Sequence, residues 1–157
     1  AEDFPQIKSS LWKDARDAAE AAVKKDASFE VYASDIDENI LDVVYENALR
    51  ANVEEHMKIF AADVRSIQKE DRRGTVVCNP PYGERLLEIK DAEELYKVMG
   101  KKFVQEKGKK YYVISPHDDF EKLYGKPADK RRKLYNGMIK SYFYQFMGPK
   151  PPKRKKE

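Results

Sequence analysis

The residues best suited to chemistry are Asn79-Pro80-Pro81-Tyr82, which follow the apolar run Gly-Thr-Val-Val-Cys at 74–78. That run predicts a short buried strand. Two consecutive prolines have no N–H to donate, so the strand has to end at Asn79. The sequence therefore predicts an asparagine and a tyrosine on a stiff turn at the carboxyl end of a strand, the edge at which open α/β sheets bind ligands.

This turn suits the transfer of a group to an exocyclic amine of a nucleic-acid base. Such an amine is a weak nucleophile because its lone pair is delocalised into the ring. The side-chain oxygen of Asn79 and the carbonyl of Pro80 are two acceptors for its N–H groups, and the ring of Tyr82 offers a face to a base taken out of its stack. The alternative is a structural Pro-Pro turn with a surface tyrosine, and so short a motif needs context.

The composition is that of a charge-rich chain with enough apolar residues for a core. Of 157 residues, 41% are hydrophobic and 38% are charged, and no apolar run approaches the ~18 residues of a membrane span. The single cysteine, Cys78, excludes an internal disulfide and indicates a reducing cytoplasm. No histidines and cysteines have the spacing of metal ligands, so we expect no metal.

The net charge of +3 is concentrated at the end of the chain. Residues 150–157 carry +4, and the remaining 26 basic and 27 acidic residues carry −1. We therefore predict one folded domain over residues 1–148 and a basic, disordered tail over residues 149–157.

Helical and strand patterns alternate ahead of the turn. We expect a helix capped by Ser9 or Ser10 that runs to about Lys25, a strand at 29–34, a helix between Asp37 and Asn52, and a strand at 57–62. Such alternation implies a parallel sheet with right-handed crossovers. Asp35, Asp63 and Asn79 each follow a strand, so we expect all three at one edge of that sheet.

Each aspartate at this edge has a functional interpretation, as a ligand contact, and a structural one, as a turn or cap residue. A carboxylate after a second strand is the usual partner of ribose hydroxyls in nucleotide-like sites, which favours a functional role for Asp35. Asp37 is either part of the same site or only a helix cap. Asp63 is either a partner of an adenine amino group or a turn aspartate.

Downstream of the turn, apolar residues recur at helical spacing, and a strand follows at 111–115. The helical stripe contains Ala92, Leu95, Tyr96, Met99 and Phe103. We then expect a short helix capped by Asp118 and a terminal hairpin around Asn136-Gly137. The hairpin interleaves basic and aromatic residues, which suits contact with nucleic acid, although an edge strand protected by charge gives the same pattern.

Several segments together resemble one known family. They are Leu-Trp-Lys-Asp-Ala-Arg at 11–16, Ser-Asp-Ile-Asp at 34–37, the octet at 79–86, Leu-Tyr at 95–96 before Gly100, Lys-Leu-Tyr-Asn-Gly at 133–137, Tyr-Gln-Phe at 144–146 and Pro-Pro at 151–152. Over nearly its whole length the chain resembles the catalytic domain of bacterial large-subunit ribosomal RNA guanine-N2 methyltransferases, which usually carry a THUMP RNA-binding domain. The Asn-Pro-Pro-Tyr motif alone is shared with adenine-N6 methyltransferases.

The resemblance implies an α/β fold, the doubly wound, Rossmann-like, seven-stranded sheet of class I methyltransferases with a carboxyl-terminal antiparallel hairpin. It implies S-adenosylmethionine as methyl donor and RNA as substrate, most specifically guanine N2 of 23S ribosomal RNA. Donor contacts fall on Asp35 for the ribose and Asp63 for the adenine, with Ile36, Val64 and Asn79. Asn79, Pro80 and Tyr82 would hold the target base. RNA binding is assigned to Arg85, Lys130, Arg131, Arg132 and Lys133.

The sequence departs from the family at one point. In the family, the first and central strand ends in a glycine-rich loop that holds the donor, whereas the first of the seven glycines here is Gly74 and no Gly-x-Gly occurs. We expect an upstream segment to supply that strand, the loop and a THUMP domain, and we expect the 157-residue chain alone to bind the donor poorly and to be inactive. An adenine-N6 nucleic-acid methyltransferase and a noncatalytic RNA-binding fragment are the alternatives.

Overall fold

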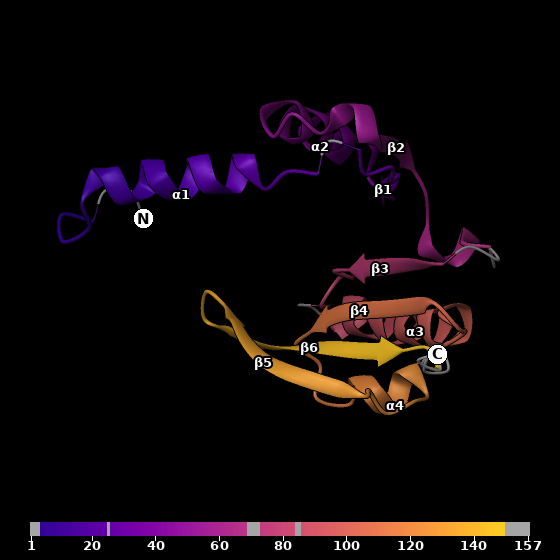
Figure 1. Ribbon diagram of the computed structural model, residues 1–157. Coiled ribbons are helices and arrows are strands. Elements are labelled where there is room, and N and C mark those ends of the chain that lie inside the picture. The colour runs from indigo at the N-terminus through magenta and orange to yellow at the C-terminus, as the bar shows by residue number, and fades with distance from the viewer. Residues whose placement is uncertain (1–3, 25, 69–72, 84–85, 150–157) are drawn as a thin grey trace, which may run out of the picture. The chain divides into compact units, whose positions relative to one another are not determined.

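The computed structural model of the chain describes residues 4–24, 26–68, 73–83 and 86–149, and within them helices and strands alternate (Figure 1). In chain order the elements are α1 (Ser9–Ala21), β1 (Val31–Asp35), α2 (Glu38–Arg50), the 3-10 helix η1 (Glu54–His56), β2 (Met57–Ala61), the 3-10 helix η2 (Val64–Ser66), β3 (Gly74–Cys78), α3 (Leu86–Lys102), β4 (Lys109–Ser115), α4 (Phe120–Tyr124), β5 (Lys130–Asn136) and β6 (Ile139–Met147). Every expected helix and strand is present, with boundaries that shift by a few residues.

The strands form two separate sheets. β1 pairs with β2, and the other four have the order β3-β4-β6-β5. β3 and β4 are parallel, with Val76 beside Tyr111, whereas β6 is antiparallel to both β4 and β5. The fold is therefore α/β with a carboxyl-terminal antiparallel hairpin, as predicted. Among the described residues no ladder joins β1 to β3.

The chain divides into two compact units, which we describe separately. One contains Ala1–Ala33 and Glu38–Phe60, and the other contains Ser34–Asp37 and Ala61–Glu157. The prediction of one domain over residues 1–148 stays a prediction. The tail at 150–157 lies outside the described residues.

The helices of the first unit differ in how they begin and end. α1 has Lys8 at its N-cap with no side-chain hydrogen bond and carries no buried residue, so the predicted serine cap is wrong, because Ser9 already lies inside the helix. α2 ends at Arg50, and Asn52, the predicted helix stop, follows it with a left-handed φ of 52°. There the N–H of Val53 donates to the Ala48 carbonyl at 3.1 Å, the closing bond of a Schellman motif.

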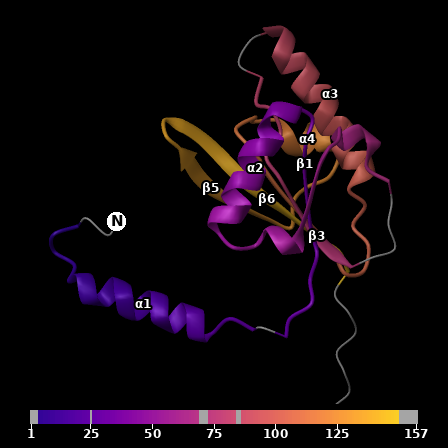
Figure 2. The same cartoon turned by 90° about the horizontal axis from the view of Figure 1, so that it is seen from above.

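The core of the second unit lies between the four-stranded sheet and the helices α3 and α4 (Figures 1 and 2). All five residues of the predicted helical stripe are buried there. The full core comprises Ala92, Leu95, Tyr96, Met99, Phe103, Tyr111, Val113, Phe120, Tyr124, Tyr144 and Phe146. Aromatic pairs dominate it, such as Tyr124 stacked on Phe146 with ring centroids 4.2 Å apart.

α4 and the terminal hairpin complete this unit. α4 has Asp119, not Asp118, at its N-cap, and no side chain caps it, so the predicted cap is wrong. The backbone N–H groups of Asp119 and Phe120 are instead satisfied by His117, through Nδ1 at 3.1 Å and the carbonyl at 3.2 Å. The hairpin turns at Gly137, as predicted, and its loop end extends beyond β4 (Figure 1).

We expect Gly100→Ala to destabilise the protein although alanine favours helices. A Cβ at Gly100 in α3 would lie 1.8 Å from the carbonyl oxygen of Tyr124, so the helices would have to separate. The free energy of unfolding should fall by on the order of 1–3 kcal/mol, measured by chemical denaturation. Gly74→Ala is the matched control, because a Cβ at Gly74 meets nothing within 4 Å. Equal effects of the two changes would contradict this account.

Candidate functional site

The turn after β3 forms one wall of a small cavity. Asn79 and Pro81 are exposed, Pro80 is buried and Tyr82 is half-buried. The cavity has a volume of about 390 Å³ and is lined by Asn79, Pro80, Pro81, Tyr82, Gly83 and Glu88. The structure thus brings together the three residues that the sequence predicted to hold a target base.

A chain of hydrogen bonds holds this turn from behind. The Tyr96 hydroxyl, on α3, donates to the carbonyl oxygen of Pro81 at 2.9 Å. The Ser115 hydroxyl at the end of β4 donates to the Tyr96 oxygen at 3.3 Å and accepts the backbone N–H of His117 at 3.2 Å. Tyr96 and Ser115 are fully buried, and burial raises the pKa of Tyr96. The turn is therefore anchored to the core of its unit through uncharged groups.

The side chain of Tyr82 is half-buried at the cavity wall. Its hydroxyl is buried and has no hydrogen-bond partner among the described residues, and its ring is half-buried. A buried hydroxyl without a partner is costly, so this side chain has an unused hydrogen-bonding capacity at the cavity wall. The role of Tyr82 in holding a base stays a prediction.

The turn is packed tightly against the start of α3. Gly83 has φ of 69°, and a Cβ there would lie 2.6 Å from Cα of Ile89 and 2.8 Å from the carbonyl of Glu88. Only glycine combines this conformation with this approach. The contact brings Glu88 to the cavity, and sequence reasoning missed it. The sequence signal that could have identified Glu88 is an acidic residue in the first turn of the helix that follows the motif.

Both ring nitrogens of His117 have partners. Nδ1 accepts from the N–H of Asp119, and Nε2 lies 3.4 Å from Oε1 of Glu93. The ring also meets Tyr96 edge to face. His117 thus braces the residues behind the turn and does not line the cavity.

Asp35 is the last residue of β1, and Ile36 follows it in an exposed turn. Oδ1 of Asp35 accepts the N–H of Asp37 at 3.0 Å, which makes an Asx turn, and Ile36 is 67% exposed. The carbonyl of Asp35 accepts the N–H of Ala62 at 2.9 Å, so Asp35 lies next to the end of β2. Asp37 directly precedes α2, at the position expected of a cap.

Asp63 caps η2 and is paired with Arg65. Its Oδ1 accepts the Arg65 backbone N–H at 2.7 Å, and its Oδ2 lies 2.8 Å from Nη1 of Arg65. The backbone and side-chain hydrogen bonds from Arg65 lower the pKa of Asp63. Val64 packs against the core of its unit. The turn interpretation of Asp63 is thereby realised, and its contact with a donor stays a prediction.

The structure does not place Asp35, Ile36, Asp63 or Val64 in the lining of the cavity that contains Asn79. Their expected arrangement along one edge with Asn79 therefore stays a prediction. The structure does join Asp35 to the residues around Asp63, and it holds Ile67, after η2, to α3 through a hydrogen bond of Lys102 to the Ile67 carbonyl at 3.1 Å.

The basic residues of β5 are exposed, but they divide between two faces. Because side chains alternate along a strand, Arg131 and Lys133 lie on one face and Lys130 and Arg132 on the other. The former share their face with two tyrosines: Arg131 lies 5.2 Å from the Tyr142 ring, and Lys133 lies 5.4 Å from the Tyr135 ring. Arg131 also pairs with Glu121 at 3.4 Å. Arg85 lies outside the described residues.

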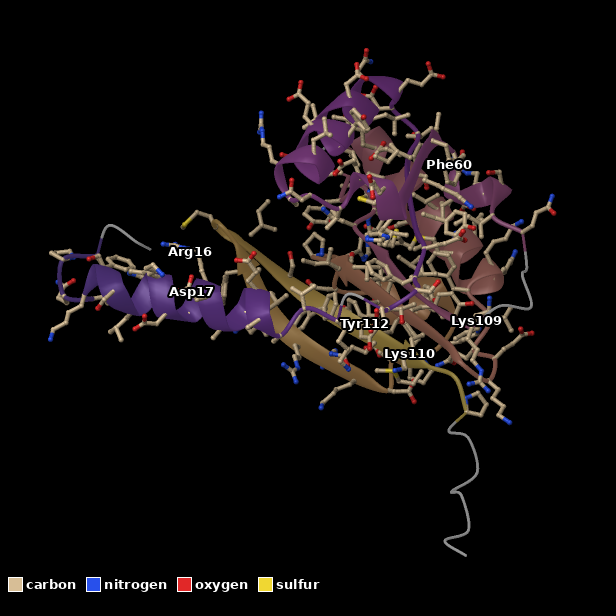
Figure 3. All side chains as sticks on the ribbon, turned by 45° about the horizontal axis from the view of Figure 1, so that its top comes forward. Arg16, Asp17, Phe60, Lys109, Lys110 and Tyr112 are labelled. Atoms are coloured by element: carbon tan, nitrogen blue, oxygen red, sulfur yellow. The ribbon has the colours of Figure 1, made fainter. Side chains whose placement is uncertain are left out.

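The opposite face of the same sheet is partly apolar. Lys110 and Tyr112 lie on β4 (Figure 3). They alternate along the strand with the buried Tyr111 and Val113, and Tyr112 stacks on Phe143 with ring centroids 5.4 Å apart. Cys78 packs against the core on the helix side, and burial raises its pKa to about 11. A thiol with so high a pKa is a poor nucleophile at neutral pH.

The part of the chain that the structure describes has neither a cluster of metal-ligating side chains nor a membrane-spanning helix. No three His, Cys, Asp or Glu side chains there are grouped so as to hold a metal ion. No helix there is both long enough and apolar enough to cross a bilayer.

Comparison with protein families and curated proteins gives consistent matches. A family model described as "RMKL-like, methyltransferase domain" matches residues 2–145. The Bacillus subtilis (strain 168) protein "Putative RNA methyltransferase YpsC" is 36% identical over 156 residues, which are 99% of this chain and 40% of that protein. "Ribosomal RNA large subunit methyltransferase K/L" of Legionella pneumophila (strain Philadelphia 1) is 33% identical over 137 residues, or 87% of this chain and 19% of that protein. The chain thus spans less than half of either relative.

Solved structures share the fold. "SMU.472, a putative methyltransferase complexed with SAH" has a TM-score of 0.79 at 31% identity, covering 96% of this chain and 40% of that one. "A predicted N6-adenine-specific DNA methylase from Listeria monocytogenes str. 4b F2365" has a TM-score of 0.72 at 33% identity, covering 94% and 38%. The expected methyltransferase fold is confirmed.

We expect Tyr96→Phe to loosen the turn while keeping the buried ring. Loss of the hydroxyl leaves the Pro81 carbonyl without this donor and the Ser115 O–H without its acceptor, so the free energy of unfolding should fall by about 1 kcal/mol. A double-mutant cycle with Ser115→Ala should show coupling, because the two groups share one hydrogen bond. Tyr45→Phe, at an exposed tyrosine of α2, is the control and should change nothing. If the two substitutions lower the free energy of unfolding additively, the hydrogen bond between Tyr96 and Ser115 is refuted.

We also expect the carboxyl of Asp63 to titrate below its ordinary pKa of 3.8, as followed by NMR. Because folding lowers this pKa, the interaction stabilises the protein above about pH 4 and is lost as the pH falls. Arg65→Gln should move the pKa back toward 3.8, whereas Arg50→Gln, at an exposed pair with Glu46, should leave it unchanged. An unaltered titration in the Arg65 variant would show that the pairing does not exist in solution.

Proposed function

The chain belongs to the RMKL-like methyltransferase domain family, and on that premise we propose that it transfers a methyl group from S-adenosylmethionine to an exocyclic amine of an RNA base. The observation that carries the proposal is the turn at 79–82, which lines a cavity and is held to the core by Tyr96. The finer proposal is guanine N2 of 23S ribosomal RNA, supported by the family resemblance and by the name of the K/L relative.

The turn performs this reaction by holding the amine. The Asn79 side-chain oxygen and the Pro80 carbonyl accept the two N–H groups of the amine, which directs its nitrogen lone pair out of the plane of the base. When bound, S-adenosylmethionine supplies an electrophilic methyl group. The base nitrogen forms its new bond as the methyl–sulfur bond breaks, and the extra proton leaves to water. Most of the rate enhancement comes from positioning and from acceptors arranged in advance.

The residues present suit the ribose and adenine parts of this donor. Asp35 keeps an exposed carboxylate at a strand end, held in place by its Asx turn, and carboxylates accept hydrogen bonds from ribose hydroxyls. The exposed apolar side chain of Ile36 suits the face of an adenine ring. In this proposal the carboxylate of Asp63 has to bind the adenine amino group while it remains paired with Arg65, and Val64 borders the ring.

The hairpin is the proposed RNA contact. Arg131 and Lys133 with Tyr135 and Tyr142 combine positive charge with aromatic rings on one face, which is the pattern that binds phosphates and stacked bases. We assign Lys130 and Arg132 to the phosphate backbone from the other face, and Arg85 to the same RNA. Binding through such residues should weaken steeply as salt rises.

Adenine-N6 methylation is the second candidate. The turn at 79–82 is common to both reactions, and the Listeria structure is described as an adenine-specific DNA methylase. Analysis of the methylated nucleoside separates the two.

We expect Asn79→Ala to lower methyl transfer by about 10²-fold or more, because it removes an acceptor that acts on the reacting nitrogen. The assay measures label from S-adenosylmethionine in unmodified large-subunit ribosomal RNA, with N2-methylguanosine as the expected product. It is run on the 157-residue chain and on the chain extended at its amino end by the predicted glycine-rich segment. Asn47→Ala, at an exposed asparagine of α2, is the matched control.

Two results would contradict the proposal. If Asn79→Ala keeps the full rate, the turn is not catalytic. If neither form transfers methyl groups yet both bind RNA in a salt-dependent way, the noncatalytic RNA-binding alternative is favoured.

A further inference from the structure

The loop end of the β5–β6 hairpin, residues 134–139, carries a group of exposed apolar side chains, and we call these residues the tip. Met138 is 98% exposed and Tyr135 is 65% exposed, and Leu134 and Ile139 are exposed as well. Single exposed apolar residues are common on protein surfaces, whereas a contiguous group of them marks a contact surface. The tip is therefore a candidate for binding a partner.

The apolar side chains of the tip lie on both of its faces. In the antiparallel ladder of β5 and β6, Leu134 pairs with Ser141 and Tyr135 pairs with Lys140. Neighbouring residues of a strand point to opposite faces, so Leu134 and Tyr135 lie on different sides, and Met138 lies in the turn that joins the strands. A patch that packs on a protein surface needs one apolar face, whereas a blade that enters between two stacked bases meets an aromatic ring on each side.

The tip lies at the same edge of the sheet as the turn at 79–82. β3, which ends just before that turn, runs parallel to β4. Ser115, the last residue of β4, pairs with Tyr142 of the antiparallel β6, so the residues of β6 that precede Tyr142 continue past this edge (Figure 1). At about 3.3 Å per residue, Met138 extends roughly 13 Å beyond the end of β4. An RNA bound across this edge therefore meets both the turn and the tip.

Basic side chains lie behind the tip on both faces. Lys133 and Lys140 share the face of Tyr135. Arg132 is exposed on the opposite face. Lys140 lies 3.8 Å from Asp118, an exposed pair of the kind that contributes little and that a phosphate can replace. Positive charge behind an apolar end complements a nucleic acid, whose phosphates lie outside its stacked bases.

Methyl transfer to a stacked base requires that base to leave its stack. The reacting amine has to reach the turn, and the base that turns out leaves an empty place between its neighbours. Proteins that deform nucleic acids insert apolar side chains, methionine among them, between base steps. Methionine is unbranched, flexible and polarisable, so it adapts to an irregular gap between aromatic rings.

We propose that Met138 inserts into the RNA stack next to the target base and occupies the place that this base leaves. Leu134 and Tyr135 contact the bases on either side, and the basic residues behind the tip bind phosphates. The inference rests on the proposed function, because that function brings an RNA base to the turn, and it adds that the base comes from a stacked, helical segment of RNA. Met138 is a positioning residue, since it does not touch the reacting atoms.

The binding test uses two RNA duplexes of one sequence, one of them intact and the other with an abasic site at its centre, where the empty place already exists. The 157-residue chain should bind the abasic duplex about 10-fold more tightly, which is within the range of side-chain stacking on a base. Met138→Ser should bring the ratio of the two affinities close to one, and Met138→Leu should keep it, because leucine is also an apolar wedge. Val104→Ala, at an exposed valine between α3 and β4 and so at the opposite edge of the sheet, is the matched control.

Circular dichroism shows whether the variants fold, and the ratio is read only from folded protein. The inference is overturned if the wild type prefers neither duplex, if it binds no RNA, or if Met138→Ser keeps the preference. It is also overturned if the tip joins two copies of the chain, in which case sedimentation would show a dimer that Met138→Ser dissociates.

Methyl transfer to folded, unmodified large-subunit ribosomal RNA separates failure of this inference from failure of the proposed function. In an enzyme form that is active, Met138→Ser should lower kcat by about 10-fold and change KM less, because the phosphate contacts remain. If methyl transfer occurs but Met138→Ser keeps the wild-type kcat, Met138 is not the wedge, and the proposed function stands. If no RNA is methylated but the preference for the abasic duplex depends on Met138, the tip enters RNA and the proposed transfer fails.

Discussion

A hydrogen bond of 2.9 Å from the Tyr96 hydroxyl to the Pro81 carbonyl connects the core of the second unit to the turn on which its chemistry depends. Tyr96 has no freedom to move, because it is fully buried and packs edge to face against Phe120 with ring centroids 5.0 Å apart. Because Pro80 and Pro81 have restricted φ angles, holding the Pro81 carbonyl also restricts the backbone of the turn that carries Asn79. An acceptor held in advance costs no reorganisation when the reaction occurs, which is the physical advantage of building the site on a core.

The same core determines which surfaces remain for a substrate. α3 and α4 cover one face of the four-stranded sheet, and aromatic residues such as Phe103, stacked on Tyr111, fill the space between them. The hairpin extends past β4, so the helices do not bury its outer part. Its basic residues remain solvated, as charged groups must unless they are paired. A nucleic acid bound along the hairpin would exchange those water contacts for phosphates.

A parallel sheet is continuous only where a hydrogen-bonded ladder joins each pair of neighbouring strands. β1 and β2 pair with one another, and β3 to β6 form their own sheet, but no ladder joins β1 to β3 in the described chain. A strand edge without a partner leaves N–H and C=O groups for water or for another segment. The cavity at Asn79 is built by the turn after β3 and the start of α3, whereas Asp35 ends β1 and Asp63 follows β2, the strands of the other sheet. This division explains why the turn is fully formed while its relation to Asp35 and Asp63 stays a prediction.

The sequence alone determined the elements and the motif. Helical spacing from Ala92 to Phe103 identified a stripe that is buried in full, and the two prolines identified where β3 ends, because periodicity and the missing N–H of proline are local properties. The predicted burial of that strand is wrong, since β3 has no buried residue and Val77 is 71% exposed. The contacts that the Asn-Pro-Pro-Tyr turn makes depend on the tertiary structure. Glu88 reaches the cavity only because Gly83 allows close packing, and Tyr96 supports Pro81 only because α3 folds back over the sheet. Hydrogen bonds between residues 15 or more positions apart depend on packing, which no local pattern encodes.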